Sequence, residues 1–131
     1  MKNTFKIIGI IALVAVIGFS FTACDDGNNE GTLQLQNIDT SGAYDQGRIT
    51  RVSIYKWGTS DSILSDENTI NPGHHRDFTL SDGEYRIELT SQVFRGGGYF
   101  MPKDRTSEKI IITKGTTTSV YYDPSDGTFV Y

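Results

Sequence analysis

Residues 78–89 read FTLSDGEYRIEL, and this stretch decides the fold class. Residues 85–89 alternate apolar and polar side chains, which is the period-2 pattern of a strand with one buried face. Residues 78–80 alternate in the same way, and Ser81-Asp82-Gly83 lies between the two runs. Glycine accepts the positive φ that a tight turn requires. The stretch therefore predicts a hairpin of two antiparallel strands, with the apolar members of 85–89 in the core.

Further β-rich runs follow along the chain, at residues 32–36, 48–57, 108–113, 117–123 and 128–131. The apolar residues of 48–57 occupy both phases, so this strand is either covered on two faces or bulged. No stretch after Gly31 shows a capped helical period, and residues 60–68 are the only place for a short helical turn.

Glycine-containing turns separate several of these runs. Lys114-Gly115 and Asp126-Gly127 have the composition of hairpin turns, like Ser81-Asp82-Gly83. The chain thus has about seven short strands at roughly ten-residue spacing. A parallel sheet would need crossover helices, and the sequence predicts none. We expect an all-β fold, a single antiparallel β-sandwich of about seven strands.

The first 23 residues differ in composition from the rest. Lys2 and Lys6 precede an unbroken apolar run at 7–19, which is the arrangement of a cleaved signal peptide. An uncleaved membrane-spanning helix is the alternative, because the uncharged stretch 7–24 has 18 residues. Either interpretation places the remaining chain outside the cytoplasm, since the basic flank stays inside.

The segment that follows, Phe21-Thr22-Ala23-Cys24, resembles the lipobox of bacterial lipoproteins, with Phe21 where Leu is usual. The resemblance implies a signal peptide over 1–23, cleavage before Cys24 and a thioether-linked diacylglycerol on that cysteine. It usually also implies acylation of the new amino group. Two or three acyl chains hold a protein firmly on a membrane. We therefore expect a cell-envelope protein whose membrane partner is reached through the lipid on Cys24, the sole cysteine of the chain.

Residues 24–31 contain three acids and two glycines but no apolar residue after Cys24, so we interpret them as an acidic, flexible tether. Residues 32–131 are then the folded domain. Without residues 1–23 the chain keeps ten basic against sixteen acidic residues, a net charge of about −6. This balance argues against nucleic acid or an anionic membrane surface as a partner, because both require clustered Lys and Arg.

A second resemblance covers residues 72–122, which are similar to transthyretin-like and carboxypeptidase-regulatory-like β-sandwiches. It is carried by the phenylalanine strand, glycine turn and Tyr-led strand of 78–89, and by the strand–glycine–strand pattern at 110–120. Such modules usually act as accessory or binding domains, so the resemblance implies binding and no catalysis.

Residues with catalytic or metal-binding chemistry are few. His74, His75 and Asp77 could form a weak His/carboxylate metal site, but exposed turn residues are the simpler interpretation. No serine or acid falls in a nucleophile-elbow or kinase-like pattern, and the glycines at 96–98 lack the Lys-Ser/Thr ending of a phosphate loop. We predict no catalytic residue, no metal and no cofactor.

The candidate recognition segment is residues 91–107, which we interpret as a 17-residue connection. Connections of this length in compact domains usually have a function. Arg95, Tyr99 and Phe100 are the candidate ligand-binding residues, although the aromatic rings of this segment could instead cap the core. We expect a non-catalytic binding or adhesion domain for a protein or carbohydrate ligand. The alternative is a structural or assembly lipoprotein that holds a protein partner at the membrane, and an enzyme is the third possibility.

Overall fold

A computed structural model describes residues 29–39, 46–95, 98–99 and 102–131, and within these ranges every regular element is a strand. The predicted signal peptide and Cys24 lie outside the described residues. No described segment forms a helix that is long and apolar enough to cross a membrane. The strands are β1 (Glu30–Asn37), β2 (Gly47–Lys56), β3 (Ser62–Asp66), β4 (His75–Ser81), β5 (Gly83–Arg95), β6 (Gly98–Tyr99), β7 (Lys103–Thr106), β8 (Ile110–Ile112), β9 (Thr117–Asp123) and β10 (Thr128–Val130).

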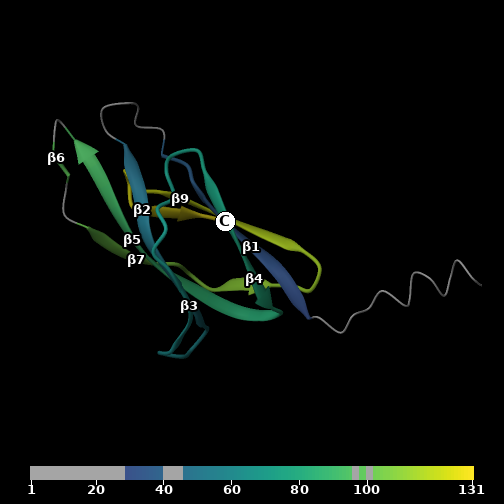
Figure 1. Ribbon diagram of the computed structural model, residues 1–131. Helices are drawn as coiled ribbons and strands as arrows, with labels where there is room; N and C mark the ends of the chain where they lie inside the picture. Colours follow the sequence, from purple (N-terminus) through teal and green to yellow (C-terminus); the bar gives the residue numbers. More distant parts are fainter. Residues whose placement is uncertain (1–28, 40–45, 96–97, 100–101) are drawn as a thin grey trace, which may run out of the picture.

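The strands form two sheets (Figure 1). The first has the order β10-β9-β1-β4, and the second begins β3-β2-β5. The far edge of the long strand β5 is shared by three short strands: β8 pairs with its beginning, β7 with its middle and β6 with its end. Strand β5 is therefore the central strand of the second sheet.

Apolar side chains from both sheets form one core, so the two sheets face each other in a β-sandwich-like fold. Leu33, Leu35 and Val120 come from the first sheet, whereas Tyr85 and Ile87 come from the second. The exposed fractions of Tyr85 and Ile87 are 1 % and 0 %, which confirms the predicted inward phase of residues 85–89.

Three expectations about topology are wrong. The described ranges hold ten strands and not about seven, because β3, β6 and β7 were not predicted. Strand β3 lies where the only helical turn was expected, paired with β2. Strands β1 and β9 pair in parallel, so the sheet is not wholly antiparallel. This parallel pair needs no crossover helix, because the chain between β1 and β9 passes through the other sheet.

The predicted hairpins also differ from the structure. Asp126-Gly127 does join an antiparallel pair, β9 and β10. By contrast, the connections at residues 81–83 and 113–116 join strands of opposite sheets, β4 to β5 and β8 to β9. Both flanking strands point apolar residues into the same core from opposite sides, and a local turn pattern cannot distinguish this arrangement from a hairpin.

For residues 48–57 the sequence left two possibilities, a strand covered on both faces or a bulged strand. Strand β2 has the irregular pairing of the second. Its register shifts at Ile54/Tyr55 against β3 and at Ile49/Arg51 against β5. The first shift leaves Ile63 of β3 as the extra residue, and the second leaves Thr50 of β2, so β2 is bulged against β5. A bulge adds a residue on one strand and redirects the side chains around it. The second bulge determines the geometry of the candidate site.

Candidate functional site

The site begins with the bulge in β2. Ile49 lies across from Ser91 and Arg51 lies across from Thr90, so Thr50 is the additional residue. Its hydroxyl donates to the carbonyl oxygen of Thr90 at 3.2 Å. Because of the extra residue, Arg51 projects from the outer face of the sheet while the next residue, Val52, is buried in the core.

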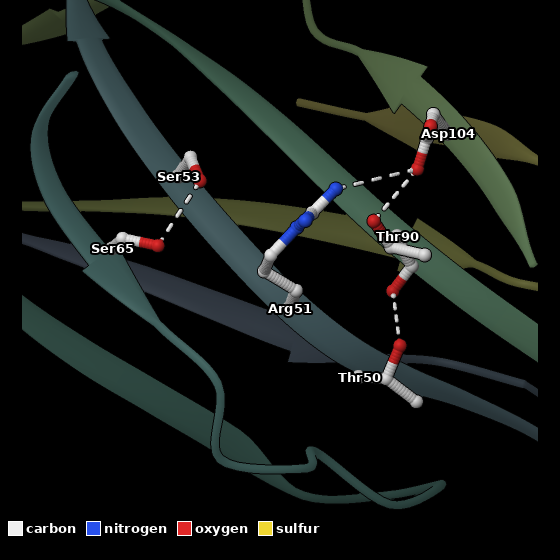
Figure 2. A network of polar contacts seen from close by, with 6 residues as sticks. All are labelled: Thr50, Arg51, Ser53, Ser65, Thr90 and Asp104. Carbon is white, nitrogen blue, oxygen red and sulfur yellow. Dashed lines mark hydrogen bonds and ion pairs between the residues drawn. The ribbon is translucent and has the colours of Figure 1, made fainter.

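Arg51 reaches across β5 to β7. Its Nη2 lies 3.8 Å from Oδ1 of Asp104, and the same carboxylate oxygen accepts a hydrogen bond of 2.7 Å from the hydroxyl of Thr90 (Figure 2). The side chains of Arg51 and Asp104 are 53 % and 78 % exposed. Because an ion pair so exposed contributes little to stability, both charged groups are free to exchange this contact for one with a ligand.

A groove of about 300 Å³ surrounds this ion pair on the outer face of the sheet. A shallower hollow continues it past Thr50 and Pro102, and shares the walls formed by Arg51, Thr90 and Asp104. The groove is lined by Arg51, Ser53, Tyr55, Ser65, Glu67, Glu88, Leu89, Thr90, Asp104, Arg105 and Thr106. Its size is at the lower end of the range for small-ligand sites.

Further polar contacts hold the groove walls in place. The hydroxyls of Ser53 and Ser65 lie 3.3 Å apart and join β2 to β3 (Figure 2). The guanidinium of Arg86 lies 4.3 Å from the ring centroid of Tyr55, and its Nη2 lies 3.3 Å from Oε1 of Glu88. Cation–π contact and ion pairing together fix the orientation of the Tyr55 ring. These side chains stand on the paired strands β2, β3 and β5.

The groove offers hydrogen-bonding groups of several kinds. Hydroxyl groups donate and accept, the carboxylates accept and the guanidinium donates. His74 is exposed just before β4 and His75 is exposed on β4, so both histidines lie at the other sheet and not at the groove.

The predicted metal candidates lie apart from the groove. Nδ1 of His74 contacts the Pro72 carbonyl oxygen at 3.1 Å, and the Asp77 carboxylate accepts from Nε2 of Gln34 at 3.1 Å. Among the described residues, no group of three or more His, Cys, Asp or Glu side chains is placed to hold a metal ion.

The interpretation of residues 91–107 as one long connection is wrong. Strand β5 continues to Arg95, β6 pairs back on its end, and β7 occupies Lys103–Thr106. Phe100 and the side chains of Arg95 and Tyr99 lie outside the described residues, so their predicted role is not placed. Val93 is buried, in agreement with the alternative that part of this segment covers the core.

Sequence reasoning missed the residues that form the groove, including Arg51, Thr90 and Asp104. One indication was present: the mixed phase of residues 48–57 pointed to a bulge, and bulges often redirect side chains at binding sites. The fold and the groove together define a β-sandwich-like protein with a polar surface site. The chain matches no family model and shows no significant similarity to a curated protein or to a solved structure.

Proposed function

We propose that this chain is a lipid-anchored cell-envelope protein whose β-sandwich-like domain binds a carbohydrate, without catalysis, in the groove around Arg51 and Asp104. The observation that carries the proposal is the density of exposed, oppositely charged and hydroxyl groups on rigid strands. The likeness of residues 72–122 to accessory β-sandwich modules supports the same class of function.

A sugar presents adjacent hydroxyls that both donate and accept hydrogen bonds. Carboxylate and guanidinium groups pair with two such hydroxyls at once, and charge-assisted hydrogen bonds are stronger than neutral ones. Asp104 and Arg51 supply these groups side by side, with Thr90 behind them. A polyanion fits less well, because the acids Glu67, Glu88 and Asp104 outnumber the arginines of the groove.

Binding to a glycan array tests the ligand class. Any glycan that binds the full chain should bind Arg51→Ala and Asp104→Ala more weakly. The expected loss of binding free energy is about 1–3 kcal/mol, the scale of a hot-spot truncation. Melting temperatures should hardly change, because the ion pair is exposed. Asp77→Ala, an exposed acid on the other sheet, is the matched control and should bind like the wild type. Equal binding by all three variants would exclude the groove as the site.

Metabolic labelling with a tagged fatty acid tests the anchor. The wild-type chain should carry the label, and Cys24→Ser should abolish it. Labelling of the Ser variant would contradict lipidation at Cys24. An unlabelled chain that retains residues 1–23 would instead support the uncleaved helix.

Arg95, Tyr99 and Phe100 stay as a predicted extension of the ligand site, because they precede β7, which supplies Asp104. The double variant Tyr99→Ala/Phe100→Ala should weaken binding of the same glycan by ~1–3 kcal/mol while the melting temperature stays nearly unchanged. A sharp fall in melting temperature would assign these rings to the core.

One observation favours the second candidate, a structural or assembly lipoprotein. Strand β10 is at the edge of its sheet, and its last residue, Val130, and the next residue, Tyr131, are about half exposed. An edge strand with apolar side chains can add a partner's strand. In this case the lipoprotein extracted in mild detergent should sediment as a larger complex that Val130→Lys dissolves. A wild-type chain that sediments as a monomer would exclude this function.

A further inference from the structure

We propose that the end of the domain nearest the anchor rests on the lipid bilayer, and that Trp57, Ile63 and Ile111 contact the membrane interface there. These three residues are called the apolar rim below. The inference rests on the proposed lipid at Cys24, and it adds an orientation of the domain that the anchor alone does not give.

The position at which the chain enters the domain is fixed. The Asp82 N–H donates to the carbonyl oxygen of Asn29 at 2.6 Å, and the Gly115 N–H donates to that of Glu30 at 2.9 Å. The start of β1 therefore lies between the β4–β5 connection and the turn before β9, close to the first residues of β5 (Figure 1). The segment that leads to Cys24 leaves the domain at this end.

The apolar rim lies at the same end, on the outer face of the second sheet. The Trp57 N–H donates to the carbonyl oxygen of Glu84 at 2.9 Å, and Ile111 is the partner of Glu84 in the β5–β8 register. Ile63 is the residue bulged out of the β2–β3 register. Glu84 is only two residues after Asp82, which holds Asn29. Trp57, Ile111 and the entry point thus share the first residues of β5, and Ile63 lies on the next strand pair, beside Tyr55, whose partner on β5 is Arg86.

Large apolar side chains are unusually exposed in this rim. The exposed fractions are 45 % for Trp57, 47 % for Ile63 and 60 % for Ile111. The ammonium group of Lys109 lies 5.6 Å from the ring centroid of Trp57 and 3.1 Å from the carboxylate of Glu84. An indole beside a lysine suits the boundary between lipid headgroups and acyl chains, where one end of the side chain is apolar and the other is hydrated.

The short distance to the anchor identifies the bilayer as the surface that meets this rim. Only residues 25–28 separate Cys24 from Asn29. Even a fully extended chain spans at most about 3.6 Å per residue, so the entry point stays within roughly 18 Å of the lipidated cysteine. Tethering at this range makes a weak contact effectively intramolecular. The Lys109 ammonium beside Trp57 is paired with Glu84, so the proposed contact is apolar and does not need anionic lipid.

Fluorescence tests the contact, because Trp57 is the only tryptophan of the chain. The full lipidated chain is reconstituted in phosphatidylcholine vesicles, with or without bromine on the acyl carbons nearest the headgroup. We expect brominated lipid to quench Trp57, and we expect its emission in unbrominated vesicles to lie at shorter wavelength than that of the double variant Ile63→Ser/Ile111→Ser in the same vesicles. The double variant Ile63→Ser/Ile111→Ser should lose most of the quenching.

Val130→Ser is the matched control. Val130 is exposed to a similar extent, 49 %, but it pairs with Tyr121 in the other sheet, near the far end of β1 from Glu30. This variant should be quenched like the wild type. Quenching that falls equally in Val130→Ser and in the rim variant would overturn the proposed orientation.

The fatty-acid label is measured on the same samples, so the two proposals fail separately. Absence of the label would overturn the anchor and, with it, this inference. A labelled protein whose Trp57 emission is unquenched would overturn the membrane contact alone. The Trp57 emission could instead shift to shorter wavelength without quenching, and lose this shift when the protein is diluted in lipid. That result would show that a second copy covers Trp57, and it would likewise overturn the membrane contact.

Discussion

Buried polar side chains replace missing backbone contacts at two points of the domain. The Asn37 amide donates to the carbonyl oxygens of Gly47 and Ile70 at 2.9 and 3.0 Å, and so ties β1 to the second sheet. The Ser107 hydroxyl accepts from the Ile87 N–H at 2.8 Å, in the gap between β7 and β8 along β5. Such groups are costly to leave unpaired in a core.

Two buried tyrosines are expected to make the free energy of unfolding fall at alkaline pH. Burial raises the pKa of Tyr122, and this outweighs the opposite effects of the Ser91 hydrogen bond and of Arg105. Burial and the charge of Asp82 also raise the pKa of Tyr85. The folded state therefore favours the neutral phenols. Their contribution is complete below the unfolded pKa of about 10 and is lost as pH rises through the folded pKa.

The corresponding prediction concerns Tyr122→Phe. Its free energy of unfolding, measured in urea from pH 8 upwards, should fall less steeply above about pH 10 than that of the wild type. Ser91→Ala is the control, because it removes the hydrogen bond to Tyr122, at 3.1 Å, and keeps the titrating phenol. Ser91→Ala should lose about 1 kcal/mol at neutral pH and keep a steep alkaline decline. Parallel pH profiles for Tyr122→Phe and the wild type would contradict this account.

For the strands, the sequence predicts which face is buried better than it predicts which strands pair. The inward side of β5 follows from the alternation at 85–89, because the period is a local property. The partners of each strand depend on contacts distant in sequence, so two glycine turns were mistaken for hairpins. The groove was missed for the same reason: Arg51 and Asp104 approach each other only because β2 and β7 pair with opposite edges of β5.

Two isoleucine truncations test these assignments. Ile87→Ala should cost about 2–5 kcal/mol, since the side chain is fully buried in the core. Ile111→Ala makes the same chemical change on an outward position of β8 and should alter stability by no more than about 0.5 kcal/mol. Both values come from urea unfolding. Similar costs for the two would mean that a strand is shifted by one residue, since such a shift exchanges the faces.

For the whole molecule, β1 is the strand on which the first sheet depends. It pairs with β4 on one side and with β9 on the other, so its partners lie far apart in the sequence. A chain that ends at Thr116 lacks β9 and β10, together with the buried Val120 and Tyr122. We expect it to lose the cooperative thermal transition and the near-ultraviolet dichroism of packed aromatics.

Removal of residues 128–131 alone is the milder comparison. It deletes β10 and the ring of Phe129, which packs 4.9 Å from that of Tyr122. It leaves β1 paired on both sides. This variant should melt at a lower temperature but still cooperatively. A cooperative transition in the chain ending at Thr116 would show that the parallel pair is dispensable.

The parallel pairing of β1 and β9 also sets the timing of folding during synthesis. Among the described strands β1 is synthesised first, and it can pair with β4 early, but its pairing with β9 cannot form until residues 117–123 have followed. Pairings so distant in sequence form slowly, because closing the long intervening loop costs conformational entropy before the strand contacts stabilise it. A nascent chain of this topology can therefore complete its first sheet only after nearly all of the described residues have been synthesised.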